Sequence, residues 1–327
     1  MAGSPRRRSF RTAPLALVAV ALAPIGVAAA ELPDALRPGV HTTTIGGLRI
    51  AYHVAGQGPV VLAHPGGPGA EWSYLRMPEV EALATVVYIE PVGTGASGSL
   101  PEGEGYAIER YVADVDGLRG RLGLEGMVLL GHSHGGFVAQ AYALAHPDRL
   151  RGLILYDTTP TTGPEWQKDV EANLAWFEDE PWFAEATAAL AEETSARTDE
   201  QMTAIFRREM PLYFGAWTAR AAEYEPLRQL MRFNVAPSRS ATDPSSPSEV
   251  GVAPAFDVRE QLPSIRTPTL VIVGHRDFVC SEHFGRLLHE RIAGSGLVVL
   301  KQSGHMGHVE EPKAFASAVG AFLHALP

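Results

Sequence analysis

The sequence has little cysteine and no clustered positive charge. Its single cysteine, Cys280, cannot form a disulfide bond within the chain, and no Cys-x-x-Cys pair is present to bind zinc or an iron–sulfur cluster. The 327 residues contain 27 basic and 37 acidic side chains, and no block of Lys or Arg follows the first dozen residues. A disulfide-stabilised scaffold, a thiolate metal site and a nucleic-acid-binding surface are therefore excluded.

Cofactor signatures are also missing. No spacing of His, Asp or Glu indicates a metal-binding cage, and no dinucleotide-type glycine motif opens the first crossover helix. We therefore expect chemistry that needs neither a metal nor an organic cofactor.

The first 30 residues have the pattern of a signal peptide. Arg6, Arg7, Arg8 and Arg11 precede an uncharged stretch rich in Ala, Val and Leu, and three alanines at 28–30 supply a cleavage pattern. Residues 7–10, Arg-Arg-Ser-Phe, resemble a twin-arginine export signal. The alternative is an uncleaved membrane anchor, which Pro24 and Gly26 disfavour. We expect an exported protein, periplasmic or extracellular, with no stable membrane association after cleavage.

The remaining chain alternates short apolar runs with amphipathic helical stretches. The runs are nearly continuous, as expected for parallel strands buried on both faces. Gly46-Gly47 lies between two further strand-like segments and predicts an antiparallel hairpin at the sheet edge. The sequence thus predicts an α/β fold with a doubly wound, mostly parallel eight-stranded sheet. The expected strands are 41–45, 48–54, 60–63, 85–89, 127–130, 153–156, 270–273 and 297–300, and the expected helices are 106–122, 137–146, 281–292 and 312–326.

Residues 159–262 interrupt this alternation. They are helical in pattern, contain four of the five tryptophans, and carry 18 acidic against 9 basic side chains. We interpret them as a helical cap inserted into a core formed by residues 31–158 and 263–327. Most of the acids are explained as solvated helix faces, although a few could line a pocket for a cationic group.

A candidate nucleophile lies at residues 131–136, Gly-His-Ser-His-Gly-Gly, between an expected strand and an expected helix. Gly-x-Ser-x-Gly in this context is typical of the nucleophile elbow, in which small residues permit a sharp turn that exposes the serine hydroxyl. The alternative is an ordinary strand-to-helix connection. From this strand-to-helix context we assign Ser133 as the nucleophile.

A serine nucleophile needs a base and an acid that orients the base. His305 follows the last expected strand, and Asp277 follows the one before it. Both loops should emerge at the carboxyl edge of the sheet with Ser133, so we predict a Ser133, Asp277, His305 triad. His308 is the second choice for the base and Asp157 for the acid.

The loop at residues 64–69, His-Pro-Gly-Gly-Pro-Gly, follows the third expected strand. Glycine allows close approach of the backbone to a substrate, and rigidly held N–H groups stabilise the oxyanion that forms when a carbonyl is attacked. We predict that the N–H groups of Gly67 and His134 form the oxyanion hole. The alternative is a turn without a catalytic role.

Together, the Gly-Gly-Pro-Gly loop, the serine motif, Asp277 and the Ser-Gly-His of residues 303–305 resemble the proline iminopeptidase branch of the α/β-hydrolase superfamily over residues 41–327. The resemblance implies cleavage of an amide or ester without a metal, with cap carboxylates that pair with a substrate amine. The sequence departs from the family pattern at three places. Pro65 stands where the family has His, residues 90–97 lack the usual arginine, and His134 replaces a tryptophan.

Three functions remain open from the sequence. The first is an exported aminopeptidase-like serine hydrolase acting on short peptides, and the second is a carboxylesterase or lactonase acting on a small neutral substrate. A catalytically silent binding protein is a remote third possibility. The acids nearest to cap aromatics in sequence, and so the candidates for binding an amine, are Glu178, Asp179, Glu180, Glu209, Glu223 and Glu225.

Overall fold

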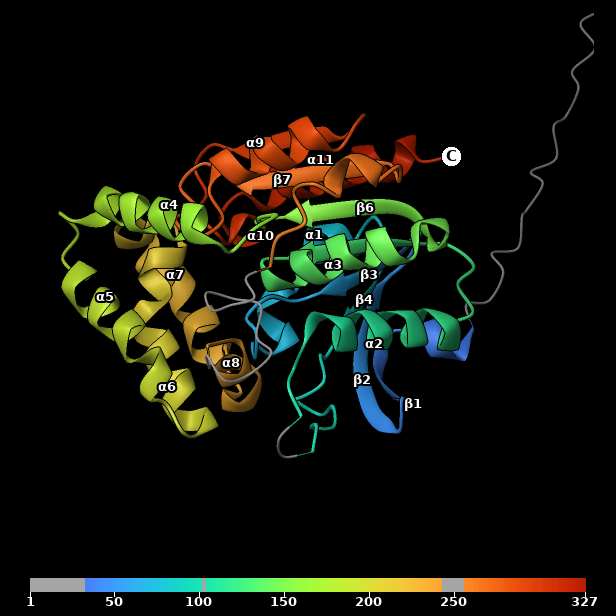
Figure 1. The fold of residues 1–327 in the computed structure, drawn as a ribbon, viewed down its shortest axis with the longest axis horizontal. Coiled ribbons are helices and arrows are strands. Elements are labelled where there is room, and N and C mark those ends of the chain that lie inside the picture. The colour runs from blue at the N-terminus through green and yellow to red at the C-terminus, as the bar shows by residue number, and fades with distance from the viewer. Residues whose placement is uncertain (1–32, 102–103, 243–255) are drawn as a thin grey trace, which may run out of the picture. The chain divides into compact units, whose positions relative to one another are not determined.

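Eight strands form a single sheet in the part of the chain that the computed structural model describes, residues 33–101, 104–242 and 256–327 (Figure 1). The strand order is β1-β2-β4-β3-β5-β6-β7-β8. Only the β1–β2 and β2–β4 pairs are antiparallel. The predicted mostly parallel sheet is thus confirmed, whereas the predicted signal peptide lies outside the described residues. The strands are β1 (Gly39–Ile45), β2 (Leu48–Gly56), β3 (Val60–His64), β4 (Thr85–Ile89), β5 (Met127–His132), β6 (Leu150–Tyr156), β7 (Thr269–Gly274) and β8 (Gly296–Leu300).

The central strands are buried on both faces. Every residue of β4, β5 and β7 is buried. Because successive side chains of a strand point to opposite faces, helices must cover both sides of the sheet. These helices are α1 (Pro78–Glu81), α2 (Ile108–Arg121), α3 (His134–Ala145), α9 (Glu282–Arg291), α10 (Gly307–Glu310) and α11 (Pro312–Ala325).

The hairpin predicted from Gly46-Gly47 forms the antiparallel edge of the sheet. Gly46 and Gly47 join β1 to β2. Their φ angles are 55° and 82°, which residues other than glycine rarely adopt. The parallel strands that follow end at one edge of the sheet, which brings together the loops after β3, β5, β7 and β8.

The helical insertion lies between β6 and β7, seen at the left of Figure 1. An isolated antiparallel bridge between Thr161 and Asp257 ties its two ends together. The cap limits of 159 and 262 stay a prediction. Its helices are α4 (Pro164–Leu174), α5 (Phe183–Glu192), α6 (Asp199–Glu209), α7 (Trp217–Leu230) and α8 (Val235–Thr242).

Cap and sheet share one hydrophobic core. A single cluster of buried side chains contains Val61 and Ile272 of the sheet together with Phe206 and Phe214 of the insertion. Each large apolar side chain buried in this way stabilises the fold by about 1.5–3 kcal/mol. The insertion thus contributes to the same core as the sheet.

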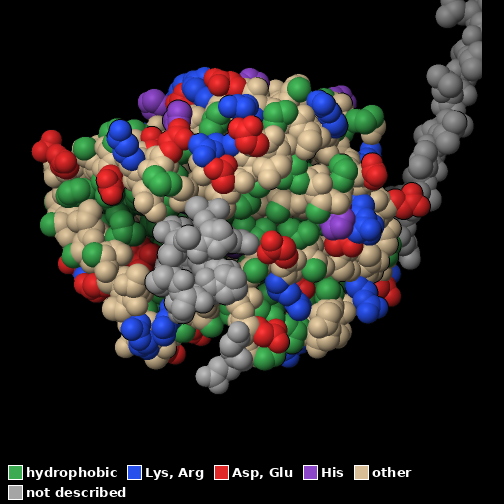
Figure 2. All heavy atoms as spheres, viewed as in Figure 1, with side chains coloured by type: hydrophobic (Ala, Val, Ile, Leu, Met, Phe, Trp, Pro, Cys, Tyr) green, Lys and Arg blue, Asp and Glu red, His purple; other side chains and the backbone are tan. Residues whose placement is uncertain are grey.

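On the outside, acidic and basic side chains are interspersed over the face shown in Figure 2. On the cap, Arg208 contacts both Glu185 and Glu192, for example. Among the described residues, every helix is too short or too polar to cross a bilayer.

Candidate active site

Ser133 occupies a strained turn between β5 and α3. Its φ and ψ angles are 54° and −122°, which is unfavourable for a residue with a Cβ. A Cβ at Gly131 would lie 2.2 Å from the carbonyl oxygen of Gly135, so the turn requires glycine at its base. The Ser133 N–H donates to the Tyr156 carbonyl at 3.0 Å, which holds the turn against β6.

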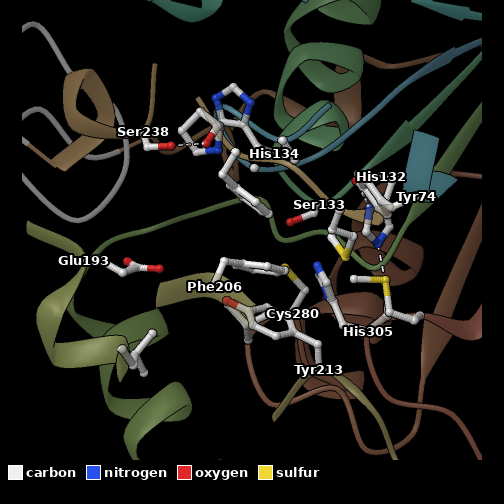
Figure 3. Close-up of a pocket in the computed structure, with 18 of the residues that line it drawn as sticks. Tyr74, His132, Ser133, His134, Glu193, Phe206, Tyr213, Ser238, Cys280 and His305 are labelled. Atoms are coloured by element: carbon white, nitrogen blue, oxygen red, sulfur yellow. Dashed lines mark hydrogen bonds between the residues drawn. The ribbon is translucent and has the colours of Figure 1, made fainter. Parts of the chain in front are cut away.

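Asp277 and His305 are brought together at the same edge of the sheet. The Nδ1 of His305 lies 2.7 Å from Oδ2 of Asp277, and both side chains are buried. Oδ1 of Asp277 accepts from the N–H groups of Val279 and Cys280, each at 3.0 Å, which orients the carboxylate. With the Nδ1 proton directed at Asp277, Nε2 of His305 remains to accept a proton. The ring of His305 and the side chain of Ser133 face the same cavity (Figure 3).

The second-choice residues have other partners. Nδ1 of His308 lies 2.8 Å from the Tyr156 hydroxyl, and its Nε2 lies 2.8 Å from the Tyr74 carbonyl. Burial lowers the pKa of His308 to about 4. Oδ1 of Asp157 accepts from the Gly274 N–H at 2.7 Å, and burial raises the pKa of Asp157 well above its usual range. Neither residue therefore takes part in the Asp277–His305 contact.

The loop after β3 packs directly on the serine. A Cβ at Gly66 would lie 2.7 Å from Cβ of Ser133. Gly67 has a φ of 114°, and both Gly67 and His134 line the cavity. Within the described residues, the N–H groups of Gly67 and His134 donate to no acceptor, so both are available to a substrate oxygen.

A chain of hydrogen bonds links this loop to His305. The Gly66 N–H donates to the Tyr74 hydroxyl at 2.6 Å, and that hydroxyl lies 2.7 Å from Nδ1 of His132. Nε2 of His132 lies 3.0 Å from the carbonyl oxygen of His305. Since a carbonyl only accepts, Nε2 carries the hydrogen and Nδ1 accepts from Tyr74. Burial lowers the pKa of His132 well below its usual range, which keeps this arrangement neutral.

The cavity above Ser133 has a volume of about 310 Å³ and is mainly apolar. Its walls come from both the core and the cap, with Phe137 on α3 and Leu190, Met202 and Phe206 on the insertion. None of the described lining residues is Lys or Arg. Glu193 is the acidic lining residue, and Figure 3 shows it across the cavity from Ser133, beyond Phe206.

Behind Glu193 lies a second carboxyl. Glu209 is fully buried, and within the described residues neither of its carboxylate oxygens meets an N–H or hydroxyl donor. Its partner is the Glu193 carboxyl. Burial first, and then the neighbouring Glu193 charge, raise the pKa of Glu209 to about 10, and burial also raises the pKa of Glu193. Both shifts favour a proton on this pair of carboxyls.

Of the six cap acids that sequence proximity to aromatics singled out, only Glu209 belongs to this pair. Glu223 and Glu225 form surface ion pairs with Arg220 and Arg228, at 2.6 and 2.7 Å. Glu180 contacts the Thr218 hydroxyl. Glu193 was missed because it follows α5 with no aromatic residue beside it in the sequence.

Two groups of described residues have ligand atoms close enough to hold a metal ion, and both include His305. The first adds His132 and Asp157, and the second adds Asp277 and Cys280. Both nitrogens of His132 are already hydrogen-bonded, and Asp277 is bonded to His305. Burial raises the pKa of the Cys280 thiol, so it is protonated beside the Ser133 hydroxyl. Both nitrogens of His132, Oδ2 of Asp277 and Nδ1 of His305 thus already have hydrogen-bond partners.

Comparison with known proteins agrees with this geometry. The model of the alpha/beta hydrolase fold family matches residues 59–312, so the chain belongs to that family. It is 28% identical over 283 residues to a proline iminopeptidase of Saccharolobus solfataricus, covering 83% of this chain and 87% of that protein. It is also 28% identical to a 2-hydroxy-6-oxo-2,4-heptadienoate hydrolase of Pseudomonas putida, with 86% and 94% coverage. A hydrolase structure from Pseudomonas aeruginosa superposes with a TM-score of 0.65 at 29% identity, covering 88% and 98% of the two chains.

Proposed function

We propose that this hydrolase cleaves a small amide or ester through an acyl-enzyme formed on Ser133. His305 Nε2 takes the hydroxyl proton as Ser133 attacks the carbonyl, and Asp277 stabilises the resulting imidazolium. The N–H groups of Gly67 and His134 stabilise the oxyanion. His305 then returns the proton to the leaving group, and a water molecule releases the acyl group by the same steps.

The Asp277–His305 hydrogen bond at 2.7 Å, in the cavity that Ser133 enters, supports this proposal most directly. A fluorophosphonate probe followed by peptide mass spectrometry tests it. We expect one adduct, on Ser133, and loss of turnover of a nitrophenyl ester in parallel, with no effect of a chelator. Absence of both adduct and turnover would instead support a silent binding protein.

We propose further that the preferred substrates carry a free amine, as in an aminopeptidase. The Glu193–Glu209 pair supports this, since a buried carboxyl beside a second, partly exposed one is a costly arrangement that an ammonium group would relieve. The ammonium of a bound substrate would take the place of the proton on this pair.

The lining also argues against an anionic substrate. A dienoate such as that in the name of the Pseudomonas putida relative carries a carboxylate, whereas the described lining offers Glu193 and no Lys or Arg. A neutral ester stays as the second candidate because most of the lining is apolar.

A substrate panel separates these candidates. We would compare naphthylamides of proline and alanine, their N-acetylated forms, and a nitrophenyl ester. An aminopeptidase prefers the free amines strongly, and an esterase turns over the ester alone. Equal rates on free and acetylated amides would contradict the assignment of the carboxyl pair.

We also propose export of the protein through its twin-arginine-like N-terminus. Periplasmic or extracellular recovery of the protein, abolished when Arg7 and Arg8 are both replaced by Lys, would support this. Cytoplasmic recovery of the full-length chain would contradict it.

A further inference from the structure

A single carboxylate joins the cap to the loop that carries the catalytic histidine. Oε1 of Glu310 accepts from the Gly215 N–H at 2.9 Å, and Oε2 accepts from the Gly304 N–H at 2.7 Å. Gly215 lies in the cap, between the turn at Met210–Tyr213 and α7, while Gly304 immediately precedes His305. Glu310 ends the short helix α10 and is 5% exposed.

The two backbones that Glu310 bridges are in direct contact. A Cβ at Gly215 would lie 2.8 Å from the Gln302 carbonyl oxygen and 3.0 Å from the Gly304 nitrogen. A Cβ at Gly304 would lie 2.8 Å from the Gly215 nitrogen and from the Tyr213 carbonyl oxygen. No side chain fits between these segments, so any change in one is transmitted to the other.

A direct hydrogen bond completes the junction. The N–H of His305 itself donates to the carbonyl of Tyr213 at 2.8 Å. The Tyr213 side chain lines the cavity, and its ring centroid lies 5.6 Å from that of His305. The backbone of the catalytic histidine is thus anchored to a residue that forms the cap wall of the substrate cavity.

From these contacts we infer that Glu310 is a positioning residue, which couples the cap to the catalytic-histidine loop and so sets the approach of His305 to Ser133. The inference rests on the proposed function only in taking His305 as the base. General base catalysis depends on hydrogen-bond geometry, and misplacement by about 1 Å can cost about a hundredfold in rate. Loss of the junction should therefore lower the rate of the chemical step more than it weakens binding.

The surroundings of Glu310 make the junction sensitive to pH. Burial raises the pKa of Glu310 to about 7, while the N–H groups of Gly304, Gly215 and Ala216 and the charge of Arg220 act in the opposite direction. The carboxyl of Glu310 also interacts through its charge with Asp157, Tyr156 and Tyr224. Protonation removes the negative charge of the carboxyl, which weakens the hydrogen bonds that it accepts from the two N–H groups. The junction is therefore weaker at low pH than at high pH.

Glu310→Gln tests the inference, with Glu311→Gln as the matched control. Glutamine keeps the size of the side chain but presents an amide NH₂ to one of the two N–H groups. Oε2 of Glu311 accepts from the Gln302 N–H and the Ser303 hydroxyl, at 2.8 and 2.7 Å, and so holds the same loop without bridging it to the cap. Both variants remove one negative charge from adjacent positions.

We expect Glu310→Gln to lower both kcat on a nitrophenyl ester and the rate of Ser133 modification by a fluorophosphonate by about tenfold or more, with KM changed less than threefold. The advantage of the wild type over Glu310→Gln should grow from pH 6 to pH 8, whereas its advantage over Glu311→Gln stays constant. Equal, pH-independent losses in the two variants would reduce Glu310 to a structural role and overturn the inference.

Hydrogen exchange at the Gly215 and Gly304 amides supplies a readout that needs no substrate. We expect faster exchange at both in Glu310→Gln and, for the wild type, less protection at pH 6 than at pH 8 after correction for intrinsic rates. If Glu310→Gln does not fold, Glu310→Asp, which is too short to reach both donors, replaces it with the same expectations. Altered exchange with no labelling of wild-type Ser133 would retain the junction and reject the proposed reaction, while unaltered exchange would reject the junction.

Discussion

The carboxyl of Glu209 is fully buried behind that of Glu193, and Glu193 lines an apolar cavity across from Ser133. Buried carboxyls are normally paired with a basic group or with N–H donors. Here no described residue donates a hydrogen bond to Glu209, and the Arg208 charge offsets the effect of burial on its pKa only in part. The free protein therefore carries an unfavourable arrangement that a cationic ligand can relieve.

Replacing this carboxyl should stabilise the free protein in a pH-dependent manner. The pKa of Glu209 is raised from 4.5 to about 10, so between these values the folded state keeps a proton that the unfolded state has lost. Stability from this group is fully present below pH 4.5 and falls as pH rises. Thermal melts should show Glu209→Gln exceeding the wild type by about 2–4 °C or more at pH 8, with little difference at pH 4. A gain that is larger at pH 4 would contradict the raised pKa.

The same pair should govern selectivity for a free amine. Glu193→Gln and Glu209→Gln should each raise KM for an alanine naphthylamide by about tenfold or more, since one ion contact in a buried site is lost, and change KM for a neutral ester little. Glu192→Gln is the matched control, because Glu192 is next to Glu193 in sequence but pairs with Arg208 at the surface. Parallel changes on both substrates would show that the pair acts on the fold alone.

Ser133→Ala and His305→Ala should each lower kcat by about four to six orders of magnitude, because the triad residues act as a unit. Asp277→Asn should be nearly as severe, since its amide favours the wrong tautomer of His305. Asp157→Asn is the comparison variant, as Asp157 bonds the Gly274 N–H instead. A mild Asp277→Asn together with a severe Asp157→Asn would move the acid to Asp157.

Removing the Tyr74 hydroxyl should impair catalysis without blocking substrate binding. Tyr74→Phe leaves the Gly66 N–H and Nδ1 of His132 without partners, so the loop that presents Gly67 loses its support. We expect kcat to fall by about ten- to a hundredfold with KM nearly constant, measured on the nitrophenyl ester. Tyr52→Phe, whose hydroxyl donates to Ala35 on the sheet edge, should leave kcat unchanged. An equal loss in both variants would point to general destabilisation.

Much of the fold could be predicted from local patterns. Strands buried on both faces, such as Thr85–Ile89, require continuous apolar runs, and a glycine pair specifies the hairpin before them. The order of the strands could not be predicted in this way. β4 lies between β2 and β3, and nothing within any one strand encodes which neighbour it pairs with.

Some residues of the site could likewise be predicted from the sequence, and others could not. Ser133, Asp277 and His305 each follow a strand, so their positions in the chain predict that they lie at the same edge of the sheet. The supporting contacts do not follow from position, because Tyr74 and His132 are 58 residues apart and Gly215 and Glu310 are 95 apart. Glu193 could have been suspected only by noticing that the helices α5 and α6 turn back on each other, which places its carboxyl against Glu209.

The contact between Gly215 and Gly304 limits how the enzyme can be redesigned. Grafting a cap from another hydrolase would have to preserve a bare backbone at this point, since any side chain there would displace His305. The cavity walls supplied by Leu190, Met202 and Phe206 lie on other segments of the cap and carry no such constraint. Libraries meant to change substrate range should therefore vary α5 and α6 and leave residues 213–215 unchanged.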